Sequence, residues 1–75
     1  MPFIHVYAMS GRDMETKKKA AQAIVKAASE AMSAPETSFT LVYEEVERED
    51  WKKDITQALV EPLRDKLLIE RGELV

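Results

Sequence analysis

Pro2 is the residue of this chain with the most unusual chemical potential, because it directly follows the initiator Met1. Removal of Met1 would give Pro2 a free secondary amine. An ordinary α-amino group titrates near ~7.7 to 8.0, and burial or a neighbouring cation lowers that pKa by disfavouring the charged form. The sequence therefore predicts that Pro2 acts as a general base at neutral pH. With Met1 attached, the same nitrogen is a tertiary amide without a basic lone pair, so the prediction requires removal of Met1.

The other residue types that commonly carry chemistry are scarce in this sequence. His5 is the only histidine and there is no cysteine, so neither a metal cluster nor a Ser/His/Asp set can be built within one chain. His5 lies inside a strand-like run, and we interpret it as a core or interface residue. The acidic run at Glu44, Glu45 and Glu47 is interpreted as a solvated strand end, because neighbouring strand residues point to opposite faces. We expect neither a metal nor a cofactor.

Composition predicts one small soluble domain covering residues 1–75, with 45% apolar and 33% charged residues. A domain of this length buries only about 60% of the surface that its unfolded chain exposes, so it is marginally stable alone. Disulfides cannot supply the missing stability in a chain without cysteine. We therefore expect burial to be completed by oligomerisation, with a homodimer favoured and a homohexamer as the alternative.

Charge and hydropathy argue against nucleic acid and membrane partners. The formal net charge is -3 with both signs interleaved, whereas phosphate binding needs a concentrated basic face. The run Lys17-Lys18-Lys19 is interpreted as a solvated helix face, since three consecutive helical residues point in different directions. No segment has the roughly 18 apolar residues of a membrane span, and no leader is recognisable. The sequence predicts a cytoplasmic protein.

The first half of the chain has the pattern of a strand followed by a long helix. The run from Pro2 to Met9 is short, β-branched and aromatic, and apolar on both faces, as in a buried parallel strand. Asp13 is a suitable N-cap for a helix that continues to Met32. The Ala34-Pro35 pair ends this helix, because proline disfavours helical geometry in the preceding residue and cannot continue the hydrogen-bond ladder.

A second strand and a second helix follow. Residues Ser38 to Val46 form the predicted strand, so the first half is a β-α-β unit with parallel strands. Glu47 to Asp50 is interpreted as a loop. Apolar residues recur at helical spacing from Trp51 onward, with a kink or restart expected at Pro62, and Gly72 is expected to end this helix. The predicted fold class is α/β: one β-α-β unit with a two-stranded parallel sheet, plus a C-terminal helix.

One face of such a sheet remains without cover. Two helices can cover one side of two strands, and the opposite side carries either Phe3, Tyr7 and Met9 or their alternates in the strand. A second copy of the chain is the simplest cover for that side.

Three segments of this sequence resemble the 4-oxalocrotonate tautomerase family. Pro2 opens the first strand, Gly11-Arg12 follows that strand, and Ala34-Pro35-Glu36-Thr37-Ser38 is similar to the family's Ala-Pro-x-Thr-Ser before its second strand. The longer C-terminal segment after Trp51 resembles the short bacterial branch that forms dimers. The resemblance implies the same fold and the use of Pro2 as the catalytic base.

The resemblance also implies three substrate-binding residues. Arg12 would hold a substrate carboxylate bidentately, from its own or a neighbouring subunit. Trp51 would exclude water and stack on a planar substrate. Thr40 stands where the best-known members have a second arginine, so it could donate one hydrogen bond but cannot replace the charge. We therefore expect a small monocarboxylate substrate, such as an aryl enolpyruvate, rather than a dicarboxylate.

Keto–enol tautomerisation of a 2-oxo acid is the predicted activity, an isomerase reaction implied by the resemblance. Two alternatives stay open at the level of sequence. The same proline could serve a decarboxylase or a dehalogenase, in which its ammonium form acts as an acid. The chain could instead be a non-catalytic dimeric binding module in which Pro2 is idle.

Overall fold

The computed structural model describes all residues, 1–75, and divides into two compact units, Met1–Glu45 and Val46–Val75. Each unit is described by itself. That the two act together as a single domain remains a prediction from the sequence.

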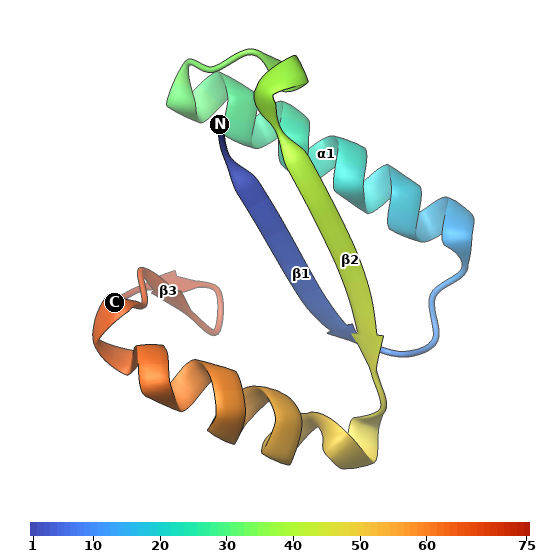
Figure 1. Cartoon of the computed structure of the whole chain (residues 1–75), viewed down its shortest axis with the longest axis vertical. Coiled ribbons are helices and arrows are strands. Elements are labelled where there is room, and N and C mark those ends of the chain that lie inside the picture. The colour runs from blue at the N-terminus through green and yellow to red at the C-terminus, as the bar shows by residue number, and fades with distance from the viewer. The chain divides into compact units, whose positions relative to one another are not determined.

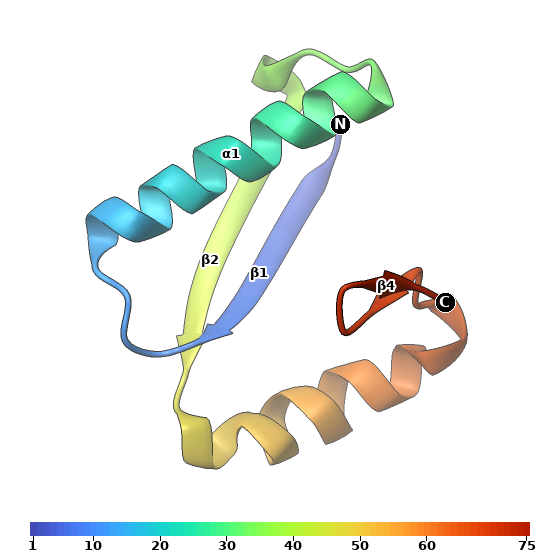
Figure 2. The same cartoon turned by 180° about the vertical axis from the view of Figure 1, so that it is seen from behind.

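The first unit is a β-α-β unit. Strand β1 (Phe3–Met9) leads into helix α1 (Met14–Met32), and the chain returns through a short 3₁₀ turn, η1 (Glu36–Ser38), to strand β2 (Thr40–Val46). The strands β1 and β2 run parallel in a two-stranded sheet, and α1 lies across one face of it (Figures 1 and 2). This confirms the predicted fold class, although β2 begins two residues later than predicted because η1 occupies the preceding turn.

The ends of α1 lie where capping chemistry predicts. Asp13 is the N-cap, and its Oδ1 accepts a hydrogen bond from the amide of Thr16 at 2.8 Å. The helix ends at Ser33, a C-cap in the left-handed conformation with φ of 53°. The next amide, that of Ala34, donates to the Ser29 carbonyl at 3.1 Å, so the last turn is closed before Pro35.

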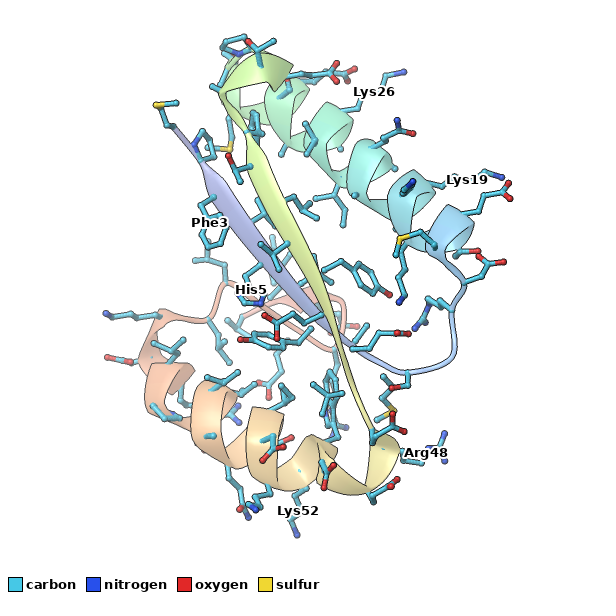
Figure 3. The ribbon with its side chains drawn as sticks, turned by 45° about the vertical axis from the view of Figure 1, so that its right-hand side comes forward. Phe3, His5, Lys19, Lys26, Arg48 and Lys52 are labelled. Carbon is cyan, nitrogen blue, oxygen red and sulfur yellow. The ribbon has the colours of Figure 1, made fainter.

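The two faces of β1 differ in exposure. The alternating residues Ile4, Val6 and Ala8 are half-buried, whereas Phe3 is 62% exposed. Figure 3 shows Phe3 on the side of the sheet away from α1. The single chain therefore does not bury both faces of this strand, and the side bearing Phe3 is the side for which the sequence predicts a second copy as cover.

The second unit is mainly helical. A 3₁₀ turn, η2 (Arg48–Asp50), stands where the sequence predicts a loop, and it is followed by the π-helical segment η3 (Lys52–Val60) and the 3₁₀ segment η4 (Glu61–Lys66). The winding changes at Pro62, the second residue of η4, and the helical dihedral angles are interrupted at Leu63. The restart predicted at this proline is therefore present, since proline cannot donate to the preceding turn.

The end of this unit differs from the sequence prediction. The helix ends at Lys66 rather than at Gly72, and an antiparallel hairpin of β3 (Ile69–Glu70) and β4 (Glu73–Leu74) follows. Its two turn residues, Arg71 and Gly72, have φ of 52° and 82°. Positive φ at both positions is the requirement of a two-residue type I′ hairpin, so the glycine serves a strand turn.

Burial in the chain is sparse. Ile55 in η3, 6% exposed, is its only buried side chain. None of the helices has the length and apolar character needed to cross a membrane.

Candidate functional site

Pro2 and Thr40 lie together at one end of the β1–β2 sheet. The amide of Thr40 donates a hydrogen bond to the carbonyl of Pro2 at 3.2 Å, which pairs the start of β2 with the residue before β1. Parallel pairing has this effect because it brings the amino ends of both strands to the same edge. Two of the predicted site residues are therefore neighbours through their backbone.

The Pro2 ring is half-buried and Met1 projects fully into solvent. Because the hydrogen bond to Thr40 uses the Pro2 carbonyl, it is independent of whether Met1 is attached to the Pro2 nitrogen. Removal of Met1 would leave a secondary amine at the start of a strand whose position is already fixed.

Arg12 lies at the opposite end of β1, in the loop that leads into α1. Its side chain is exposed, and Nη1 donates to the carbonyl of Met9 at 3.3 Å. This bond takes one of the five donors of a planar guanidinium, a group suited to bidentate binding of a carboxylate.

Arg12 and Pro2 of one chain are far apart. They are separated by the length of β1, which at about 3.3 Å per residue is roughly 20 Å. Two unit charges at that distance in water interact by only about 0.2 kcal/mol, and the distance exceeds the Debye length of about 8 Å at physiological salt. One pKa unit corresponds to about 1.4 kcal/mol, so the charge of Arg12 is too distant to act on Pro2 of the same chain.

The loop that carries Arg12 is held by Glu45, near the end of β2. Glu45 Oε2 accepts from the amide of Gly11 at 3.1 Å, and Glu45 Oε1 accepts from Nζ of Lys17 at 2.5 Å. These contacts, led by the Lys17 hydrogen bond, lower the pKa of Glu45 below its ordinary value. Glu45 is an exposed residue near the end of β2, as the sequence predicts, and its carboxylate in addition binds Gly11 and Lys17.

The three consecutive lysines of α1 do point in different directions, as helical geometry predicts. Lys17 reaches the sheet, while Lys19 forms an exposed pair with Glu15 at 3.2 Å. Figure 3 shows Lys19 and Lys26 projecting from the side of α1 away from the sheet. The lysine run is thus a solvated face only in part, since Lys17 is 19% exposed.

His5 belongs to a row of side chains on the sheet face opposite α1 (Figure 3). Its ring stacks on that of Tyr7, with centroids 4.2 Å apart, and lies edge-on to Phe3 at 6.1 Å. Nε2 of His5 is 3.0 Å from Oε1 of Glu44. Glu44 and Glu45 therefore point to opposite faces of β2, as strand alternation predicts.

Trp51, the remaining predicted site residue, belongs to the second unit. It follows η2 directly, precedes η3, and is half-buried. The single chain has no pocket, and no group of three or more acidic or histidine side chains converges as metal ligands would.

Two comparisons with known proteins bear on this arrangement. A family model described as tautomerase enzyme matches residues 2–54. The match begins at Pro2, covers the whole β-α-β unit, and extends past Trp51. A comparison with curated protein sequences gives no match.

Proposed function

The chain belongs to the tautomerase enzyme family, and on this premise we propose that it catalyses keto–enol tautomerisation of a 2-oxo acid with Pro2 as the general base. The observation that carries the proposal is the start of the family match at Pro2, the residue that removal of Met1 would expose as a secondary amine. The hydrogen bond from Thr40 supports it by fixing Pro2 at the edge of the sheet.

The proposed reaction moves one proton. The Pro2 amine removes the proton from the enol hydroxyl, and the electron pair of the C=C bond forms a new C–H bond as the resulting ammonium returns a proton to carbon. The C–O bond becomes a carbonyl. The Pro2 ammonium, having given its proton to carbon, is again a neutral amine at the end of the cycle. A base whose pKa lies near the ambient pH performs both transfers best, which a dry site for Pro2 would favour.

The substrate is proposed to be a small monocarboxylate. Arg12 binds its carboxylate bidentately, while Thr40, which is uncharged, donates a single hydrogen bond to the carbonyl or enolate oxygen. Trp51 is proposed to stack on the planar part of the substrate and exclude water. A single cation matches one carboxylate, so we favour an aryl enolpyruvate such as phenylenolpyruvate over a dicarboxylate.

A homodimer is the proposed assembly, with a homohexamer as the alternative. Two observations support an oligomer: the roughly 20 Å between Pro2 and Arg12 in one chain and the exposed side chain of Phe3. In this proposal Arg12 enters the site of a neighbouring copy. The cytoplasmic location and the absence of nucleic acid and membrane partners stay predictions from the sequence.

The test compares three purified proteins whose amino termini are verified by mass: the chain without Met1 (the trimmed chain), the chain that retains Met1, and Pro2→Ala without Met1. We expect the trimmed chain to ketonise phenylenolpyruvate. Loss of a positioned general base typically costs 10²- to 10⁴-fold in rate, so the other two proteins should lose roughly that factor in kcat/KM.

Equal activity of the chain that retains Met1 and of the trimmed chain would refute the role of Pro2. Decarboxylation or dehalogenation by the trimmed chain, without ketonisation of any enol acid, would replace the proposed reaction by another one on the same amine. Complete inactivity of the trimmed chain across these substrates would favour a non-catalytic module.

A further inference from the structure

Glu45 connects three parts of the first unit that are distant in sequence. It lies near the end of β2, its Oε1 accepts from Lys17 in the first turns of α1, and its Oε2 accepts from the amide of Gly11 in the loop after β1. The two bonds span 28 and 34 residues of sequence. One carboxylate oxygen therefore ties the loop between β1 and α1 to the sheet, and the other ties the start of α1 to it.

The exposure of this ion pair sets it apart from an ordinary surface pair. The side chains of Lys17 and Glu45 are 19% and 25% exposed, whereas those of Lys19 and Glu15 on the same helix are 75% and 78% exposed. Exposed pairs are weakened by solvent and salt, and the Lys17–Glu45 pair is the less exposed of the two. The chain thus offers a matched Glu–Lys pair that lacks the loop contact.

Gly11 gives the loop a point of high backbone freedom immediately before Arg12. Gly11 has φ of 133°, and a Cβ at this position would meet no atom within 4 Å. The glycine is therefore needed for its backbone conformation rather than for space, and glycine is also the residue with the widest choice of alternatives. The bond from its amide to Glu45 selects one of these conformations immediately before Arg12.

We propose that Glu45 is a positioning residue for substrate binding, which holds the loop from Ser10 to Asp13 so that Arg12 is presented in one orientation to the substrate carboxylate. The inference rests on the proposed function, because it assigns Glu45 to the same site. Glu45 acts through Arg12 and does not touch the substrate.

The charge state of Glu45 is consistent with this role. Its pKa is held below the ordinary value chiefly by the Lys17 hydrogen bond and also by the backbone amides of Gly11 and Arg12, so all of these contacts favour the carboxylate form.

The first measurement is independent of activity. Backbone ¹⁵N relaxation of the full chain is compared between the wild type, Glu45→Ala and the matched control Glu15→Gln. We expect the order parameters of Gly11 and Arg12 to fall from values typical of rigid backbone, about 0.85, toward 0.6 in Glu45→Ala only. Lys17→Gln, compared with Lys19→Gln, tests the same tie without altering β2 and replaces Glu45→Ala if that variant does not fold.

The second measurement is a double-mutant cycle on the trimmed chain with phenylenolpyruvate and its methyl ester, which lacks the carboxylate. A misplacement of a binding group by about 1 Å can cost on the order of 10²-fold, so we expect Glu45→Ala to lower kcat/KM for the acid by roughly tenfold or more. The loss should vanish in an Arg12→Ala background, where no arginine is left to position, and for the ester, where the arginine has no carboxylate to bind.

Unchanged order at Gly11 and Arg12 in Glu45→Ala would overturn the positioning role, whatever the activity. An equal loss for acid and ester, additive with Arg12→Ala, would overturn it as well, because a general loss of structure would then account for the effect. A failure of the proposed function has a different signature: Arg12→Ala or Pro2→Ala would leave the activity unchanged while the loop still loosened in Glu45→Ala.

Discussion

The two ends of the β1–β2 sheet position their residues by different means. At one end Pro2 is paired with Thr40 through a backbone hydrogen bond, which extends the ladder of the sheet beyond the start of β1. At the other end the loop that bears Arg12 is held by the side chains of Glu45 and Lys17. A contact made by the ladder persists when side chains change, whereas one made by two charged side chains can be removed by a single substitution or by acid.

This contrast indicates which substitutions should impair the proposed enzyme at each end of the sheet. The general base depends on the identity of Pro2 and on removal of Met1, but its location depends on the fold. The carboxylate-binding arginine depends on both its own identity and the residues that hold its loop. Substitutions at the two ends of the sheet should therefore differ in which kinetic constant and which structural property they change.

The largest effect that separates the two ends is expected from Arg12→Ala. Hydrogen bonds to charged groups contribute about 1.5 to 3 kcal/mol, so kcat/KM for phenylenolpyruvate should fall by roughly 10- to 100-fold. Because the arginine binds the carboxylate in both the substrate and the transition state, the loss should appear mainly in KM.

Steady-state kinetics of the trimmed chain checks this, with Arg71→Ala in the β3–β4 turn as the matched control. An unchanged KM in Arg12→Ala, or an equal rise in Arg71→Ala, would contradict the assignment of the carboxylate to Arg12.

A smaller effect is expected from Thr40→Val at the Pro2 end. The variant removes the hydroxyl that is proposed to bind the substrate oxygen but keeps the amide that bonds to Pro2. One neutral hydrogen bond contributes about 0.5 to 1.5 kcal/mol, so kcat/KM should fall by roughly two- to tenfold while the thermal unfolding temperature stays unchanged.

The Thr40 measurement pairs kinetics with thermal unfolding of the same preparation. A drop in the unfolding temperature of Thr40→Val would show that this side chain supports the fold at the Pro2 end as well, and the contrast between the ends would be lost.

The smallest effect is expected from acid. The pKa of Glu45 is lower in the folded chain than its ordinary value, so its contacts stabilise the fold at pH values above the ordinary carboxylate range near ~4.3 and that stability is lost as pH falls through the lower, folded pKa. Lys17 is the charged group that faces Glu45.

Thermal unfolding of the wild type and of Glu45→Gln tests this predicted loss of stability. The pH range, from 6 to 3, roughly brackets the ordinary carboxylate pKa. The wild type should be the more stable at the upper end, and the difference should shrink toward the lower end. Asp13, whose pKa is also lowered, chiefly by the Thr16 hydrogen bond, titrates in both proteins and so cancels from the difference. A difference that grows on acidification would have the wrong sign and would contradict the role of the carboxylate form.

Local chemistry allowed the first unit to be predicted closely. An N-cap at Asp13 and the Ala34-Pro35 stop define α1 because capping and proline sterics act within a few residues. The hairpin at the C-terminus was missed because the local sequence there is compatible with two structures. The Arg71-Gly72 pair is compatible with both a helix end and a type I′ turn, and only pairing of Ile69 with Leu74 distinguishes them.

The sequence by itself determined the chemistry: which residue can become a secondary amine, which arginine follows the first strand, and that these residues occupy a β-α-β unit of the tautomerase family. These properties follow from residue type and short spacing. Only the tertiary structure decided that Glu45 meets Gly11 and Lys17. Such contacts cross 28 to 34 residues of sequence and exist only once the parallel strands and α1 have packed, so no local pattern could specify them.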